Sequence, residues 1–184
     1  PKPPIANPVF DKDCPDPGVL GDAGTYWMVC TGGKFGIKQS RDLVTWTATN
    51  GSILPSGKAS WADNGGRNWA PELHKIGDQF LAYYTSVNDK DVLSIGAAKA
   101  SSPTGPYTDL GRPLVENGLG VIDATQFTDD DGSHWLFYKI DGNSQGKPTP
   151  IFVRKLTADG FDFEAGSTPK QGLTNAPATW AGGV

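Results

Sequence analysis

The sequence predicts an all-β fold that forms part of a β-propeller, and three observations lead to this prediction. Glycine and proline are abundant, at 24 and 15 of 184 residues, and apolar residues at helical spacing are absent. Aromatic, strand-like segments begin at Tyr26, Phe80 and His134, with a spacing of 54 residues each time. A period near fifty residues is typical of propellers, in which each repeat forms one small antiparallel sheet, a blade.

The first repeat contains the elements of one blade. We expect an extended lead-in at 1–15, followed by strands at 18–20, 26–31 and 36–40. The pair Gly32-Gly33 predicts a turn between the second and third strands. The segment 40–46 then leads to an outer strand.

The second and third repeats follow the same order. We expect their strands at 69–74, 80–85 and 93–99, and at 122–128, 134–139 and 151–156. A loop at 101–107 follows the second blade. The run Asp129-Asp130-Asp131-Gly132 predicts a solvated hairpin turn, because the rest of a calcium-loop motif is missing.

The repeat count predicts about three blades. A single blade cannot bury its own apolar face, so neighbouring blades must stack around an axis. One further period places the next inner strand near residue 178, within 174–184. Three blades would leave two open faces. We therefore expect residues 1–184 to form the N-terminal part of one propeller domain, with the remaining blades on a separate or missing segment.

Charge and composition disfavour two classes of partner. The net charge is −4 and no basic run exists, which argues against nucleic acid. No apolar run reaches membrane-spanning length. Pro1-Lys2-Pro3-Pro4 is typical of a mature N-terminus left by signal cleavage, and Asn50-Gly51-Ser52 is a glycosylation sequon, so we expect a secreted, extracellular protein. Cys14 and Cys30 form either one disulfide or two separate buried thiols, and they show no metal-site spacing.

Two aspartates open matching repeats. Asp16 lies in Cys14-Pro15-Asp16-Pro17-Gly18, and Asp123 lies in Gly120-Val121-Ile122-Asp123-Ala124. A carboxylate at the start of an inner strand points into the central pocket of a propeller. Two carboxylates across a pocket suit glycoside hydrolysis, in which one activates water and the other protonates the leaving oxygen. A turn residue at Asp16, a loop cap at Asp123, or ligand binding without turnover are the alternatives.

Five motifs resemble glycoside hydrolase family 43, whose members are five-bladed propellers that remove arabinose or xylose from plant polysaccharides. They occur in the order of the family and span nearly the whole chain. The motifs are Asn7-Pro8-Val9-Phe10 with Cys14-Pro15-Asp16-Pro17-Gly18, then Ser40-Arg41-Asp42-Leu43-Val44-Thr45-Trp46, Trp69-Ala70-Pro71-Glu72, the stretch 98–107, and Ile122-Asp123-Ala124 with Phe127 and 129–132. Ala124 stands where the family commonly has proline.

The resemblance implies roles for individual residues. Asp16 matches the general base of an inverting hydrolase, and Asp123 matches the aspartate that tunes the pKa of the general acid. The acid is a glutamate that opens the fourth blade and follows a segment similar to 180–184. Residues 1–184 contain no match to that motif. We therefore expect a second polypeptide that completes the propeller and supplies the glutamate.

Further site residues are predicted with structural alternatives beside them. Trp69 is a sugar platform or a core residue, Glu72 is a ligand-binding residue or a pair for a neighbouring blade, and Phe35 is a pocket wall. His74 is expected to be structural. The resemblance implies no required cofactor and leaves room for a structural calcium on the axis. A non-catalytic sugar-binding propeller is the main alternative function; a fructan or sucrose hydrolase is disfavoured because those enzymes open with a different motif.

Overall fold

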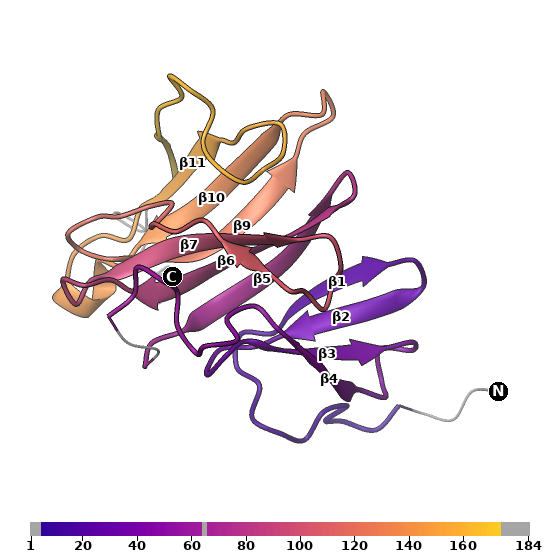
Figure 1. The fold of residues 1–184 in the computed structure, drawn as a ribbon. Coiled ribbons are helices and arrows are strands. Elements are labelled where there is room, and N and C mark those ends of the chain that lie inside the picture. Colours follow the sequence, from indigo (N-terminus) through magenta and orange to yellow (C-terminus); the bar gives the residue numbers. More distant parts are fainter. Residues whose placement is uncertain (1–4, 64–65, 174–184) are drawn as a thin grey trace.

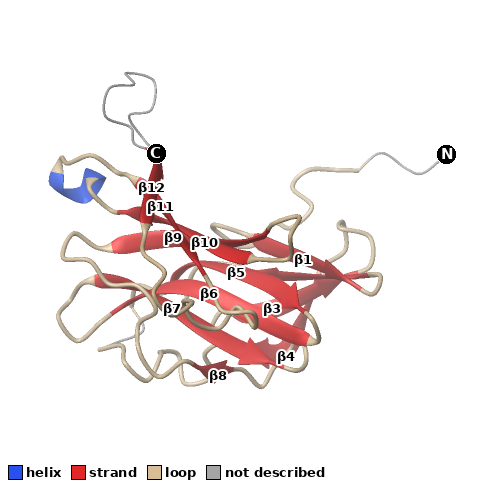
Figure 2. Ribbon diagram, turned by 90° about the horizontal axis from the view of Figure 1, so that it is seen from above, coloured by secondary structure: helices blue, strands red, loops and turns tan. Residues whose placement is uncertain are grey.

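The chain folds into three four-stranded antiparallel sheets that stand side by side as propeller blades (Figure 1). The computed structural model describes residues 5–63 and 66–173. Within them the only helix is one short 3-10 turn, η1 (Asn143–Gln145), and almost everything else is strand or loop (Figure 2). No helix in these ranges is long and apolar enough to span a membrane. The all-β prediction is confirmed.

Each blade is a meander whose strands follow chain order from the inner strand outward. The strands of blade 1 are β1 (Gly18–Asp22), β2 (Thr25–Val29), β3 (Gly36–Ser40) and β4 (Thr47–Ser52). Those of blade 2 are β5 (Trp69–Ile76), β6 (Gln79–Val87), β7 (Leu93–Ala100) and β8 (Thr108–Asp109). Those of blade 3 are β9 (Val121–Thr128), β10 (His134–Ile140), β11 (Ile151–Lys155) and β12 (Lys170–Leu173).

Blade 2 lies between the other two blades and is buried on both faces. Successive side chains of a strand point to opposite faces of its sheet. Along β6, Phe80, Ala82 and Tyr84 therefore pack into the core shared with blade 1. Leu81 and Tyr83 pack into the core shared with blade 3. This alternation explains why β6 reads as a nearly continuous apolar run in the sequence.

The outward face of blade 3 is apolar and partly open. Leu136 and Tyr138 of β10 face the core shared with blade 2, so Trp135 and Phe137 lie on the opposite face. Phe127 is the cross-strand partner of Trp135, and it is 52% exposed. Among the described residues no fourth sheet covers this face. It has the composition of a blade-to-blade interface.

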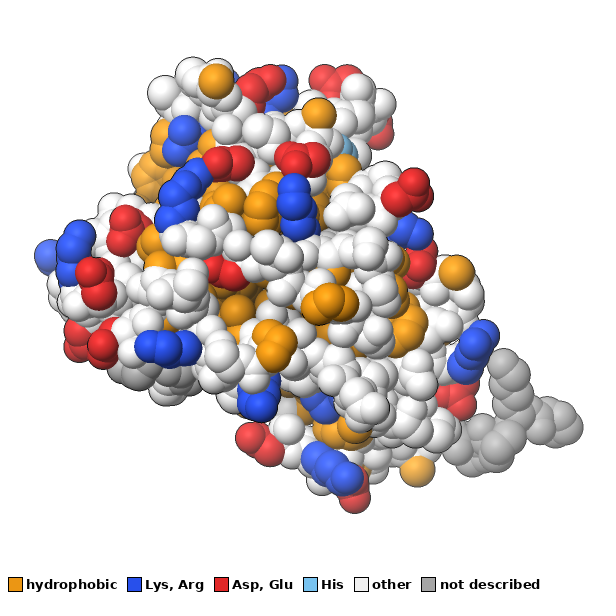
Figure 3. All heavy atoms as spheres, in the orientation of Figure 1, with side chains coloured by type: hydrophobic (Ala, Val, Ile, Leu, Met, Phe, Trp, Pro, Cys, Tyr) orange, Lys and Arg blue, Asp and Glu red, His pale blue; other side chains and the backbone are white. Residues whose placement is uncertain are grey.

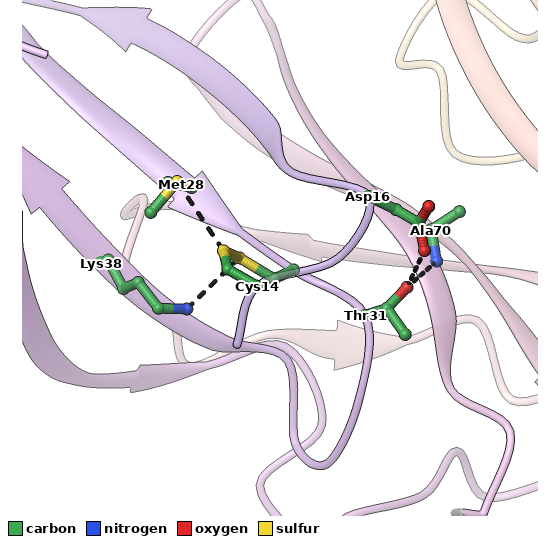
Figure 4. The surroundings of a disulfide bond; sticks show 7 residues. Cys14, Asp16, Met28, Thr31, Lys38 and Ala70 are labelled. Carbon is green, nitrogen blue, oxygen red and sulfur yellow. Dashed lines mark hydrogen bonds between the residues drawn. A yellow bond between two sulfur atoms is a disulfide. The ribbon is translucent and has the colours of Figure 1, made fainter. Parts of the chain in front are cut away.

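Cys14 and Cys30 are bonded as one disulfide, with 5.1 Å between their Cα atoms (Figure 4). The first of the two sequence alternatives is therefore the one observed. The bond ties the lead-in segment before β1 to the residue that follows β2. Pro1–Pro4 and the expected inner strand near residue 178 lie outside the described residues, so these two predictions are not addressed by the structure.

Candidate functional site

The N-terminal ends of the three inner strands lie next to one another. Strand β5 packs against β1 on one side and β9 on the other. At Gly18 the approach is so close that a Cβ atom would come within 2.5 Å of the carbonyl oxygen of Pro71, so only glycine fits. On the other side, Thr125 Oγ1 of β9 donates a hydrogen bond of 2.6 Å to Glu72 Oε2 of β5. The inner strands of neighbouring blades are thus closely packed at Gly18 and hydrogen-bonded at Thr125.

Equivalent residues occupy the start of each inner strand, and we call these the head positions. They are Asp16, Ala70 and Asp123, spaced by 54 and 53 residues. All three have left-handed backbone, with φ of 48°, 38° and 58°. Such conformations are uncommon outside glycine and cluster at functional sites, where surrounding structure holds them in place.

An irregularity of the sheet accompanies the head position in two blades. The register of β5 against β6 shifts between Trp69 and Glu72, and that of β10 against β9 shifts between Phe137 and Lys139. A bulge of this kind inserts an extra residue into one strand and re-aims its side chain. The backbone at Asp123 is therefore built to turn that carboxylate out of the regular alternation of β9.

Asp16 is exposed and joined to blade 2 through one threonine (Figure 4). Thr31 Oγ1 donates a hydrogen bond of 2.5 Å to Asp16 Oδ2. Thr31 Oγ1 also accepts a hydrogen bond of 2.8 Å from the backbone N–H of Ala70. The N–H of Thr31 also donates to the carbonyl of Pro15 at 2.9 Å. The predicted base therefore sits in a network that spans two blade heads.

Asp123 carries an ion pair within its own blade. Its Oδ2 lies 3.0 Å from Lys139 Nζ of β10, and the side chains are 48% and 15% exposed. Because the Lys139 side chain is mostly buried and its ammonium group is close, it offsets part of the negative charge of Asp123. Any effect of Asp123 on the pKa of a neighbouring acid is thus reduced by the positive charge of Lys139.

Sequence reasoning missed Thr31 and Lys139, although a signal for them exists. Thr31, Thr85 and Lys139 are spaced by 54 residues each time, the same period as the aromatic strands. Thr31 lies two residues after β2, and Thr85 and Lys139 lie within the last three residues of β6 and β10. Two of the three contact the aspartate at the head of their own blade.

Trp69 lies at the start of β5, directly before Ala70, and 36% of its surface is exposed. The Trp69 side chain is therefore neither fully buried in the core nor fully exposed. Its role as a sugar platform stays a prediction. Phe35 is different: it is fully buried, with its ring 5.5 Å from the ring of Tyr84. The prediction of a pocket wall at Phe35 is corrected, because the packing of blades 1 and 2 covers the ring completely.

Glu72 pairs with a neighbouring blade, as one of its two sequence alternatives proposed. Its Oε2 accepts from Thr125 and lies 3.0 Å from Nε2 of His74, which must donate because a carboxylate only accepts. Burial alone would raise the pKa of Glu72, but the hydrogen bonds from His74 and Thr125 outweigh it and hold the pKa below its ordinary value of 4.5. The ring of His74 is 5.8 Å from that of Tyr83, so His74 is placed in a structural role.

Glu72→Gln is expected to lower the free energy of unfolding by about 1 kcal/mol near pH 7, a value kept small because the side chain is partly exposed. The sign follows from the lowered pKa: a carboxylate that is ionised more easily when folded stabilises the fold above its unfolded pKa of 4.5. This contribution disappears as the pH falls through the folded pKa. Urea unfolding of both proteins between about pH 3 and pH 7 measures the difference.

The matched control for that experiment is Glu164→Gln. Glu164 pairs with Lys155 inside blade 3, with both side chains substantially exposed, so its loss should change stability little. An equal loss for the two variants, or a difference for Glu72→Gln that does not depend on pH, would contradict the cross-blade role of Glu72.

Comparison with known proteins gives consistent results. The sequence model of the glycosyl hydrolases family 43 matches residues 5–179. The chain is 32% identical to a β-D-galactofuranosidase of Aspergillus niger over 149 residues, which cover 72% of this chain and 44% of that protein. It is 36% identical to an arabinoxylan arabinofuranohydrolase of Bacillus subtilis over 118 residues, or 53% of this chain and 22% of that protein. The chain spans less than half the length of both relatives.

Solved structures show the same fold. A thermostable family-43 glycoside hydrolase matches with a TM-score of 0.79 at 24% identity, over 93% of this chain and 56% of that chain. A β-xylosidase/α-arabinofuranosidase from a compost microbial metagenome, solved with xylotriose in a calcium-free form, matches with a TM-score of 0.71 at 16% identity, over 90% and 61% of the two chains. These matches confirm the predicted five-bladed propeller fold, of which this chain forms a part.

Proposed function

Because the chain belongs to the glycosyl hydrolases of family 43, we propose that it supplies the base-bearing blades of an inverting glycosidase that releases arabinose or xylose from plant polysaccharides. The observation that carries this proposal is the placement of two aspartates at equivalent head positions of blades 1 and 3, with left-handed backbone at both. A carboxylate that only capped a turn would not need to recur at the same place in the repeat.

Asp16 would act as the general base. An ionised carboxylate offers about four acceptor positions, and the hydrogen bond from Thr31 uses one of them on Oδ2. The rest of the carboxylate can accept a proton from a water placed between it and the anomeric carbon. In inverting enzymes the base and the acid are ~6.5–9.5 Å apart, which leaves room for that water. In this proposal Trp69, partly exposed beside the head of blade 2, would stack on a sugar ring.

The acid in this proposal is a glutamate at the head of a fourth blade, outside residues 1–184. The glutamates of the sequence are Glu72, Glu116 and Glu164, and none of them stands at a head position. A second polypeptide that carries the remaining blades would supply it. The apolar, partly open face of blade 3, with Phe127 and Phe137 on it, suits the docking of that next blade.

Asp123→Asn in the complete enzyme is expected to lower the pKa of the acid, because a nearby negative charge that favours its protonated form is removed. The alkaline limb of the kcat/KM profile should then move to lower pH, by roughly one unit. Lys139→Met is the matched variant of opposite sign. It removes the positive charge that is paired with Asp123, so the alkaline limb should move to higher pH. An unchanged profile in both variants would contradict the tuning role.

The proposed chemistry consists of proton transfers between carboxylates, water and sugar, so it calls for no cofactor. A calcium ion on the axis would take oxygen ligands. The described residues hold no group of three His, Cys, Asp or Glu side chains that fits such an ion. Figure 3 shows acidic and basic side chains interspersed over the face seen there, which suits a neutral ligand.

The disulfide is compatible with the secretion that we propose for this protein.

An assay of the complete enzyme on aryl glycosides tests the proposal. The panel is an α-L-arabinofuranoside, a β-D-xylopyranoside and a β-D-galactofuranoside, followed by arabinan and arabinoxylan with product analysis. Release of arabinose or xylose is the expected result. Binding of xylo- or arabino-oligosaccharides without any turnover would instead identify a sugar-binding propeller.

A further inference from the structure

Each blade repeats a pair of positions: the head residue of the inner strand and the residue 15 or 16 positions further on. In blade 1 the pair is Asp16 with Thr31, and in blade 3 it is Asp123 with Lys139. In both blades the second residue contacts the carboxylate of the first, through a hydrogen bond or an ion pair. In these two blades the second position of the pair therefore supplies a hydrogen-bond donor or a cation to the carboxylate at the head position.

Blade 2 shows what happens when the carboxylate is absent. Its head residue is Ala70, whose methyl group accepts no hydrogen bond, and the equivalent donor is Thr85. Thr85 is the cross-strand partner of Trp69, is fully buried, and its Oγ1 has no hydrogen-bond partner among the described residues. A buried hydroxyl without a partner is unfavourable. The contrast indicates that Thr31 is used for its hydroxyl, whereas Thr85 is not.

We propose that Thr31 is a positioning residue that fixes the carboxylate of Asp16 against the head of blade 2. The proposal rests on the function proposed above, in which Asp16 is the general base. The geometry is that of a two-way bridge: the Thr31 hydroxyl donates to Asp16 Oδ2 at 2.5 Å and accepts from the Ala70 N–H at 2.8 Å. Because Ala70 follows Trp69, the bridge sets the base relative to the sugar platform.

Two further links hold the Asp16 and Thr31 segments together. The disulfide joins Cys14 to Cys30, so it lies two residues before Asp16 and one residue before Thr31. Between them the Thr31 N–H bonds to the Pro15 carbonyl at 2.9 Å. The two backbones are therefore pinned, and the Thr31 hydroxyl controls the remaining freedom, which is the rotation of the Asp16 side chain.

The test compares three variants of the complete enzyme on the preferred aryl glycoside. Thr31→Val has the same shape without the hydroxyl, and its kcat should fall about 10–100-fold, the range expected when a catalytic group is misplaced by an ångström or less. Its KM should stay within about twofold if only the transition state is affected. Thr85→Val is the matched control in blade 2, and its kcat should be unchanged because its hydroxyl has no partner.

Thr31→Ser keeps the hydroxyl and loses the methyl group, so it should retain kcat within about threefold. A thermal melt shows whether Thr31→Val folds. If it does not fold, the activity of Thr31→Ser still tests the role of the hydroxyl. A tenfold fall in Thr31→Ser, or equal effects of valine at positions 31 and 85, would overturn the proposal.

A double-variant cycle separates this inference from the proposed function. If Thr31 acts through Asp16, then Thr31→Val should add no further loss to an Asp16→Asn enzyme, whereas independent effects would multiply. Multiplying effects overturn the positioning role and leave the general base in place. Near-normal turnover by Asp16→Asn alone would instead remove the proposed function, and the positioning role with it.

Discussion

Asp16→Asn in the complete enzyme is expected to lower kcat by about 10²–10⁴-fold, the usual contribution of a general base. The amide has the size of the carboxylate but cannot take the proton of the attacking water. Asp16 is exposed, and its hydrogen bond comes from a hydroxyl group, which an amide oxygen can also accept. The fold should therefore survive, and thermal melts of the variant and the native enzyme should agree closely.

Asp13→Asn is the matched control for that experiment. Asp13 is an exposed aspartate of the same lead-in segment, three residues before Asp16, so its substitution removes the same charge near the same strand. Its kcat should be close to that of the native enzyme. Equal activity of the two variants would mean that Asp16 is only a turn residue between two prolines.

The fold could be predicted from the sequence because the propeller repeat is local. The aromatic strands at 26, 80 and 134 recur with a constant period, and the glycine and aspartate turns between them mark the strand ends. The alternation of β6 between two cores follows from period-two geometry alone. Asp16 and Asp123 could be named as candidates because equivalent positions of a repeat must lie at equivalent places around the axis.

The rest of the site depends on contacts between blades, which no local pattern reports. Phe35 looks like a loop residue in the sequence, yet the packing of blade 1 on blade 2 buries it against Tyr84. The bridge from Thr31 to Ala70 joins residues that are 39 positions apart. The bond between Glu72 and Thr125 likewise exists only because β5 and β9 are neighbours.

The other large effect concerns the blades outside residues 1–184. Without them the proposed acid is missing, and the apolar face of blade 3 that carries Phe127 is open to solvent. We expect residues 1–184 alone to hydrolyse no glycoside above background and to self-associate through that face. Light scattering and the sharpness of the melting transition report the association, and Phe127→Lys should reduce it by placing a charge on the face.

Activity reconstitution is the measurement that tests the central claim most directly. Residues 1–184, a polypeptide with the remaining blades, and their mixture are assayed on the preferred aryl glycoside, and the mixture is repeated with Asp16→Asn in the first component. We predict turnover by the native mixture alone, with each part silent and the Asp16→Asn mixture down by about 10²–10⁴-fold. Measurable hydrolysis by residues 1–184 on their own would contradict the division of base and acid between the two halves of the propeller.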